Sequence, residues 1–472
     1  MTTDFDPAGL AATDLDPVDP ASVDLAGLRR AVRGAVHAPG DPGYPTVGFN
    51  VTVVRRPAAV VDATSADDVA ATVAFATARG LTVGIFTTGH GGTGVDGGSI
   101  LVRTAAMDTC VVDPATRTAR IGAGVRWQTV LDAAVPHGLA PLCGSAPGVG
   151  VVGFLSGGGI GPLVRTVGSS ADYVRSITVV TGDGVVRTAT AQDNPELFWG
   201  LRGGKSTLGL ITEVVIELPQ ITEIYGGAVF FDGAEAAAVL RAWRDWAADL
   251  PTEASTSVAL VNLPPLPEVP PMLAGRLTVS VRYASVADPA TAAAAFAPMR
   301  AAAPALLDAV GPMPYAAIGA IHADPAEPMP VVESSGLLAA LPDEALDHLV
   351  ATVNSPVGPL LPGVELRQLG GAYAQDPPVR SALCHRDAAF NLHLVGMVPD
   401  EQAVPAVAGA IAAALAGVAP WSTGATLPNF VASDDPARIR RCYDDDTAAW
   451  LAALADQFDP KGVLRVGPVM RS

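Results

Sequence analysis

Hydrophobic and polar positions follow two different periods in the first half of the chain. From about Gly48 to residue 220, short β-branched runs alternate with Ala-rich stretches that have a helical spacing of apolar residues. A helix is predicted over 65–79, because Ser65 can cap its start and acidic residues follow in its first turn. Such alternation is typical of a domain that mixes helices and strands. The expected strands are 51–54, 81–86, 109–112, 118–121 and 176–181.

The pattern changes after residue 220. Proline clusters appear at 263–271, an Ala-rich helix is predicted over 288–303, and strands are predicted at 276–283 and 389–395. We interpret this part as a second domain, in which an antiparallel sheet carries helices. The end of the chain predicts one amphipathic helix, 447–457, and then a short strand.

These changes divide the chain into four segments. The first is acidic and rich in Asp and Pro, and we expect a loose arm there. A cofactor-binding domain and a substrate domain follow, and the last segment is expected to return to the first domain. Their bounds are 1–45, 46–220, 221–425 and 426–472.

Charge and cysteine content exclude several function classes. The 472 residues include 29 Lys and Arg against 47 Asp and Glu, a net charge of −18, which disfavours a nucleic-acid partner because polyphosphate recognition uses clustered cations. The 4 cysteines show no CxxC spacing, so neither a disulfide framework nor a metal site is expected.

The start of the chain and its apolar runs suggest a cytoplasmic protein. Six Asp residues and no Lys or Arg occupy the first 28 positions, whereas a secretory signal begins with basic residues. Every apolar run is broken well before the ~18 residues that a membrane-spanning helix requires. No membrane contact is expected, and the oligomeric state is not indicated.

A glycine pattern at 148–153 resembles the G-x-G-x-x-G of dinucleotide-binding Rossmann domains. That fold needs an uninterrupted helix after the glycines and an acid at the end of the next strand. Here Gly157–Gly161 would break the helix at once, and Asp172 precedes its strand. The Rossmann interpretation is therefore disfavoured.

The glycine density still indicates a ligand loop. Seven glycines lie between 148 and 161, and glycine lets a backbone approach a ligand closely. Backbone N–H groups of such a loop can hold a pyrophosphate without any Lys or Arg. A structural turn is the alternative, but turns rarely need so many glycines. A second such loop, Thr87–Gly94, contains His90 between glycines and follows the strand expected at 81–86.

Several motifs, taken together and in order, resemble one family. The resemblance covers about 57–219 and resumes near Arg367. The chain is similar to FAD-linked oxidases of the vanillyl-alcohol-oxidase fold, which carry a PCMH-type FAD-binding domain, in the berberine-bridge-enzyme-like branch. The motifs are Thr88-Gly89-His90-Gly91, Val112-Asp113-Pro114, Gly122-Ala123-Gly124-Val125-Arg126-Trp127, Gly144-Ser145-Ala146-Pro147-Gly148-Val149-Gly150, Leu197-Phe198-Trp199-Gly200-Leu201-Arg202-Gly203-Gly204, Leu369-Gly370-Gly371-Ala372, His385-Arg386, Asn429-Phe430 and Phe458-Asp459-Pro460.

The resemblance implies an α+β fold with a two-part PCMH-type FAD-binding domain and a substrate domain whose antiparallel sheet is covered by helices. It implies FAD as the cofactor, bound covalently through the ring of His90; the alternative is a His90 that only hydrogen-bonds a dissociable FAD. Ala146 stands where many members have a second linking Cys, and Cys143 does not fit that spacing. The implied cofactor-binding residues are Thr87, Thr88, Gly89, His90, Gly91, Gly92, Gly148, Val149, Gly150, Gly153, Gly157, Gly158, Gly159, Gly161 and Asn429.

The resemblance leaves the catalytic base open. Some members place a Tyr two residues before the Asn of the Asn429-Phe430 motif, where this chain has Leu427. Plant members use a carboxylate ahead of the His385-Arg386 motif, but 377–384 contains no acid. The remaining candidates are Tyr373, His393 and Asn391. His393 and Asn391 share one face of the strand 389–395, where His393 could accept a proton and Asn391 could only orient a substrate.

The expected activity is that of an oxidase. A small organic alcohol or amine would give a hydride to the flavin, and molecular oxygen would become hydrogen peroxide. Val149 lies at the motif position where the family has a small residue that admits oxygen. The scarcity of cations in the second domain argues against an anionic substrate and favours an apolar or aromatic one. The alternatives are a dehydrogenase with another electron acceptor and a redox-neutral flavin-binding scaffold.

Overall fold

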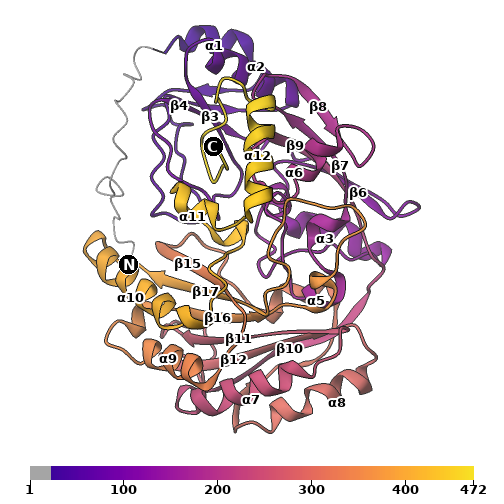
Figure 1. Cartoon of the computed structure of the whole chain (residues 1–472), viewed down its shortest axis with the longest axis vertical. Coiled ribbons are helices and arrows are strands. Elements are labelled where there is room, and N and C mark those ends of the chain that lie inside the picture. Colours follow the sequence, from indigo (N-terminus) through magenta and orange to yellow (C-terminus); the bar gives the residue numbers. More distant parts are fainter. Residues whose placement is uncertain (1–22, 472) are drawn as a thin grey trace.

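Three β-sheets organise residues 23–471, which are the residues that the computed structural model describes. Two smaller sheets belong to the first half of the chain and occupy the upper part of Figure 1, and the largest sheet lies below them. Helices α7, α8 and α9 lie along the bottom of the molecule in Figure 1, and α10 lies at its left edge, beside β15 and β17. The α+β fold class predicted from the sequence is confirmed.

The first sheet is mostly parallel. Its order is β1-β2-β4-β3, and only β1 runs antiparallel to its neighbour. The helix predicted over 65–79 forms as α2, and the Ser65 hydroxyl accepts the N–H of Asp68. The elements of this part are β1 (Val36–His37), β2 (Ala59–Asp62), β3 (Thr82–Phe86), β4 (Ser99–Arg103), α1 (Leu25–Ala31) and α2 (Ala66–Thr77).

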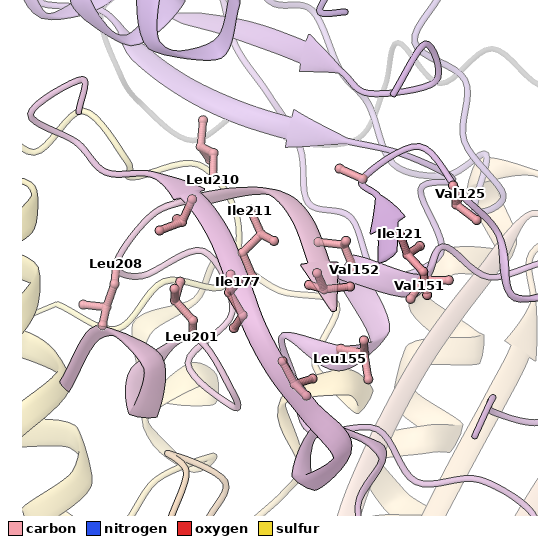
Figure 2. Packing of buried hydrophobic residues seen from close by; sticks show 14 of the residues in the cluster. Ile121, Val125, Val151, Val152, Leu155, Ile177, Leu201, Leu208, Leu210 and Ile211 are labelled. Atoms are coloured by element: carbon pink, nitrogen blue, oxygen red, sulfur yellow. The ribbon is translucent and has the colours of Figure 1, made fainter. Parts of the chain in front are cut away.

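The second sheet is antiparallel, with the order β5-β6-β9-β7-β8. Figure 2 shows the apolar side chains of α4 against this sheet, with Val151, Val152 and Leu155 beside Ile177 and Ile211. This packing fixes the short helix, and therefore the glycine that precedes it. The elements are β5 (Cys110–Asp113), β6 (Thr118–Gly122), β7 (Val174–Val180), β8 (Val186–Ala189), β9 (Leu210–Glu217), α3 (Trp127–Ala134), α4 (Val151–Leu155), α5 (Val164–Val167) and α6 (Pro195–Gly200).

The third sheet is also antiparallel and has two unlike faces. Alternate residues such as Val281, Leu366 and Leu394 pack on the helices, and the residues between them face the two smaller sheets. Its order is β13-β10-β12-β11-β16-β17-β15, with β14 beside β10. The strands are β10 (Glu223–Asp232), β11 (Ala254–Asn262), β12 (Leu277–Ser285), β13 (Ala305–Asp308), β14 (Gly311–Pro314), β15 (Val331–Leu338), β16 (Gly363–Gln368) and β17 (Phe390–Met397); the helices are α7 (Ala236–Ala248), α8 (Pro289–Arg300), α9 (Asp343–Val353) and α10 (Val404–Gly417).

The end of the chain lies against the first half. Helices α11 (Pro436–Arg440) and α12 (Asp445–Phe458) contribute Ile439, Leu451 and Phe458 to the core of the two smaller sheets. The buried carboxylate of Asp459 then accepts the N–H groups of Val463 and Leu464, and the carbonyl of Val463 accepts the N–H of Val83 at the start of β3.

Three local predictions are wrong. The arm expected over 1–45 does not include 25–37, because α1 and β1 belong to the first domain and Leu28 is fully buried; residues 1–22 lie outside the described part. Residues 51–54 form a turn, since Asn50 Oδ1 accepts the N–H of Thr52 and draws the backbone out of an extended path. The strand expected after 460 does not form, because Asp459 takes the backbone donors that a ladder would use.

One guanidinium joins the upper and lower parts of the fold. Arg165, in α5, is 8% exposed, and its side chain donates to the carbonyls of Ala254, Leu369 and Leu250 at 3.1, 2.8 and 2.8 Å. The Ser255 hydroxyl also accepts a hydrogen bond from the backbone N–H of Arg165 at 3.0 Å. The segment that follows the glycine-rich loop is thereby tied to the third sheet.

Replacing this guanidinium should destabilise the whole fold. Arg165→Met would leave three buried carbonyls without their donor, at roughly 1 kcal/mol each or more, so we expect a loss of about 3 kcal/mol in the free energy of unfolding. Urea unfolding followed by circular dichroism measures it. Arg175→Met is the matched control, since Arg175 makes an exposed ion pair with Glu217 and its loss should cost under about 0.5 kcal/mol. Equal losses for the two variants would contradict this role of Arg165.

Candidate flavin and substrate site

A cavity of about 1500 Å³ lies where the two smaller sheets meet the third sheet. One wall consists of the loop after β3 and the loop before α4, which were the two glycine loops singled out in the sequence. The opposite wall is the inward face of the third sheet. The lining of the cavity is largely apolar, and the third sheet contributes Phe230, Val261 and Leu307 to it.

His90 stands at the first wall. Its ring stacks on Phe49 with 4.0 Å between the ring centres, and its Nδ1 lies 2.9 Å from the hydroxyl of Thr88. Burial, helped by the charge of Arg126, lowers the pKa of His90 to about 4. The imidazole is therefore neutral near pH 7, which is the form in which a ring nitrogen is nucleophilic.

The first glycine loop comes close to its neighbours on one side and leaves space on the other. Gly89 has a φ of +71°, and a Cβ there would meet the backbone of Gly48. A Cβ at Gly91, which faces the cavity, would meet nothing within 4 Å. Thr87, Thr88, Gly89, His90, Gly91 and Gly92 all line the cavity.

A cation lies at this loop, although the sequence analysis expected none to be needed. Arg55 packs beside Gly92 and over the ring of Phe86, and its Nη2 has no hydrogen-bond partner. No carboxylate accompanies it among the described ion pairs, and burial lowers its pKa to about 10. A buried guanidinium without an acid favours a ligand that brings negative charge.

The second loop divides into two parts. Val149, Gly150 and Gly153 line the cavity, and Gly150 is the N-cap of α4. Gly153 also leaves open space where a Cβ would stand. The loop follows an irregular segment and not a strand, so this part owes its position to the packing of α4.

The other glycines of the second loop do not face the cavity. Gly157, Gly158, Gly159 and Gly161 are needed for packing, because a Cβ on each would collide with Asn429, Leu383, Phe154 or the carbonyl of Cys143, respectively. Gly148 lies outside the lining as well, and its carbonyl accepts from Arg126. Assigning these five glycines to cofactor contact was too broad, since glycine density reflects tight packing as well as ligand approach.

Ala146 and Cys143, near the implied second attachment point, have different surroundings. Ala146 lines the cavity, whereas Cys143 is 2% exposed and does not. Burial raises the pKa of the Cys143 thiol to about 12, which makes it unreactive.

Lys205 was missed in the sequence and lies in the cavity wall. Its ammonium group contacts Asn429 Oδ1 and lies 3.2 Å from the carbonyl of Gly153, and Asn429 also donates to the carbonyl of Phe154 at 2.8 Å. Burial lowers the pKa of Lys205 to about 8. Lys205 directly follows the motif that ends at Gly204, which was the available signal. Asn429 lines the cavity, as predicted.

The three candidate catalytic residues have different surroundings. Tyr373 and Asn391 are fully buried outside the cavity lining, so neither is placed to contact a substrate. Burial raises the pKa of Tyr373 beyond any use as a base near neutral pH. His393 does line the cavity: its Nε2 lies 3.2 Å from Glu333 Oε2, and its ring meets the edge of Phe430 at 5.1 Å.

The expectation that the substrate side lacks cations is wrong. Arg282 and Arg367 line the cavity from the third sheet, together with Glu365. The total count of cations was a poor guide, because a fold can gather few charges at one place. The available signal was the alternation along β12 and β16. Arg282 follows Val281, and Glu365 and Arg367 flank Leu366, so these charged residues point to the face of the sheet away from the apolar core.

The described residues show no helix long and apolar enough to cross a membrane. Within the same residues, His, Cys, Asp and Glu side chains nowhere gather in threes that could hold a metal ion.

Part of the chain is similar to known FAD-binding proteins. Residues 57–190 match an FAD-binding domain. A stretch of 195 residues is 32% identical to (R)-6-hydroxynicotine oxidase of Paenarthrobacter nicotinovorans, and one of 216 residues is 31% identical to glucooligosaccharide oxidase of Sarocladium strictum. These stretches cover 40% and 44% of this chain, and in both cases 43% of the relative, so the match spans less than half of either relative.

Solved structures resemble almost the whole chain. That of 6-hydroxy-D-nicotine oxidase from Arthrobacter nicotinovorans superposes with a TM-score of 0.81 at 22% identity, over 93% of this chain and 98% of that one. BBE-like 1 from Physcomitrella patens gives 0.82 at 19% identity, over 95% and 98%. The chain therefore contains an FAD-binding domain, resembles FAD-linked oxidases over that part, and has the fold of 6-hydroxy-D-nicotine oxidase and of BBE-like 1.

Proposed function

We propose that the protein is an FAD-dependent oxidase that takes a hydride from a small organic alcohol or amine and passes the electrons to molecular oxygen. The observation that carries the proposal is a single cavity with His90 and the glycine loops on one wall and the His393–Glu333 pair on the other. A cofactor and a substrate can therefore meet in it. The relatives named above are oxidases of an amine and of a sugar, which supports this reaction class.

The residues present fit FAD. Gly91 and Gly153 leave open space where a side chain would block a ligand, and Arg55 supplies a positive charge for the diphosphate. Asn429 and Lys205 would hold the cofactor from the side of α4. When bound, FAD supplies the hydride acceptor and the reaction with oxygen.

His90 is proposed to bind the flavin covalently, and no second attachment is expected. Thr88 holds Nδ1 of the ring and Phe49 holds its plane, so Nε2 is left to form the bond. The lowered pKa keeps the ring neutral, and the tautomer in which Nδ1–H donates to Thr88 has its lone pair on Nε2.

His393 is proposed to accept the proton of the substrate hydroxyl or amine. Glu333 accepts a hydrogen bond from Nε2–H in this arrangement, which leaves the lone pair on Nδ1. Glu333 is therefore a positioning residue, and His393 is the catalytic residue. Neither Tyr373 nor Asn391 is proposed again for a catalytic role, because both lie outside the cavity lining.

Covalent attachment of the flavin to His90 can be tested by the colour of the acid-precipitated protein. Acid precipitation of the purified protein should give a yellow pellet, and His90→Ala should give a colourless one with flavin in the supernatant, because the linking nitrogen is gone. Absorbance of pellet and supernatant at the flavin maximum measures both. His137→Ala, at an exposed position outside the cavity, should keep the yellow pellet. A yellow pellet from His90→Ala would rule out this linkage.

Oxygen use can be tested without knowing the substrate. The flavin is reduced anaerobically with dithionite and mixed with aerated buffer in a stopped-flow instrument. We expect fast reoxidation with formation of peroxide, slowed at least about tenfold in Val149→Ile, because a larger side chain would restrict access beside the glycine loop. Val261→Ile, on the opposite wall of the cavity, should react as the native protein does. Slow reoxidation of the native protein would favour the dehydrogenase alternative.

Proton transfer can be tested with the first alcohol, amine or oligosaccharide of a panel that bleaches the flavin anaerobically. His393→Gln should reduce the rate of bleaching about 100-fold, the usual contribution of a general base, and Glu333→Gln should reduce it about tenfold. His137→Gln is the control. An unchanged rate in His393→Gln would exclude His393 as the base, and a panel that never bleaches the flavin would favour the redox-neutral scaffold.

A further inference from the structure

A polar cluster lies on the cavity face of the third sheet, next to the His393–Glu333 pair, because its residue Glu365 on β16 is paired with His393 on β17. Ser257 on β11 is paired with Arg282 on β12 and with Arg367 on β16, and Glu365 precedes Arg367 by two positions, on the same face. His322, just after the 3-10 helix Tyr315–Ile321, lies over them. We name Ser257, Arg282, His322, Glu365 and Arg367 the floor cluster.

Glu365 is fully occupied by the other members of the floor cluster. Its Oε1 accepts Arg282 Nη1 at 2.7 Å and the Ser257 hydroxyl at 3.0 Å, and lies 3.3 Å from His322 Nε2. Its Oε2 accepts Arg367 Nε at 2.8 Å. The two guanidinium groups keep the pKa of Glu365 well below its usual range despite the burial. This carboxylate is ionised and too well held to serve as a base.

The charges of the floor cluster do not balance. Two guanidinium groups face one carboxylate, and among the described residues the ion pairs of both arginines go to Glu365. The side chains of Arg282, Arg367 and Glu365 are only 11%, 13% and 9% exposed, so water screens the excess positive charge poorly. Burial, together with the charge of Arg282, lowers the pKa of His322, so this ring adds no negative charge and little positive charge.

Nitrogen atoms of Arg282 and His322 also lack hydrogen-bond partners. Arg282 Nε is buried without a hydrogen bond, and so is His322 Nδ1 on a side chain that is 5% exposed. Both residues line the cavity. A buried cation with an unused donor is costly unless a ligand completes it.

We propose that the floor cluster binds a carboxylate group of the substrate, with Arg282 as the main contact, and that the rest of the substrate is apolar. One excess positive charge matches one negative charge, and the planar guanidinium matches a carboxylate in shape. The apolar remainder would lie along Phe230, Val261 and Leu307. This inference rests on the proposed function, because the bound carboxylic acid is a substrate only if the protein is an oxidase. It narrows the substrate class to carboxylic acids that carry an oxidisable hydroxyl or amine.

The experiment measures binding and not turnover. Purified flavoprotein is titrated with phenylacetate and octanoate, and with their neutral amides phenylacetamide and octanamide; equilibrium dialysis gives the dissociation constants, and the visible spectrum of the flavin reports occupancy beside the cofactor. We expect the native protein to bind at least one acid at least tenfold more tightly than its amide. Arg282→Met should remove this preference, because it weakens binding of the acid and leaves binding of the amide unchanged.

Two further variants separate charge from folding. Arg276→Met is the matched control, since Arg276 also lines the cavity but is 45% exposed and paired with Asp232, and it should keep the preference. Arg282→Gln has no charge but keeps a hydrogen-bond donor towards Glu365, so it should fold, and it should also lack the preference. Circular dichroism and flavin content verify the fold.

The outcomes are distinct from those of the proposed function. Equal or absent binding of acid and amide by the native protein would overturn the carboxylate site, even if the enzyme oxidises some neutral compound. A tenfold preference that survives Arg282→Met in a folded variant would overturn the role of Arg282. If the protein prefers the acid over its amide through Arg282 but oxidises no compound of the panel, the result would support the carboxylate site and contradict the proposed oxidase function.

Discussion

The contact of Arg165 with the third sheet holds the two halves of the cavity together. Its guanidinium donates to three carbonyls of another part of the chain, and no acid competes for it among the described ion pairs. Arg386 and Asp172 form a second contact of this kind, with two hydrogen bonds at 2.7 and 2.9 Å. Because the glycine loops and the inward face of the sheet come from opposite sides of these contacts, the distance between cofactor and substrate walls depends on them.

The glycines of the second loop show how packing and binding share one motif. Gly153 faces open space, whereas Gly157 to Gly161 are there because neighbouring atoms leave no room for a Cβ. The packing glycines let α4 and the segment that leads to α5 run close together. They thereby hold Val149 and Gly150 at the cavity edge, so their effect on the site is indirect.

Charge in the cavity is arranged in separate groups with different tasks. Arg55 lies at the first glycine loop, Lys205 beside Asn429, and the floor cluster on the third sheet. All three sets include a buried cation, in a chain whose net charge is −18. Burial makes the few inward cations strong binding groups for anions, because water screens their charge poorly there.

The sequence by itself determined the local elements and the cofactor class. Periodicity located α2, β3, β7, β12, α8 and β17 to within a few residues, because helix and strand periods and caps are local properties. The ordered motifs around His90 and Gly150 indicated FAD, and His393 was already a candidate. Residues 51–54 failed because a single Asn side chain outweighed β propensity.

Tertiary structure alone decided which of these residues face one cavity. Tyr373, Asn391 and His393 look equivalent in sequence, yet only His393 lines the cavity, because the side chains of the other two are fully buried outside it. The pairing of β12, β11 and β16 brings Arg282 and Glu365 together across 83 positions of sequence. Strand register sets such long-range proximity, and register follows from the packing of both faces of a sheet, which no local pattern contains.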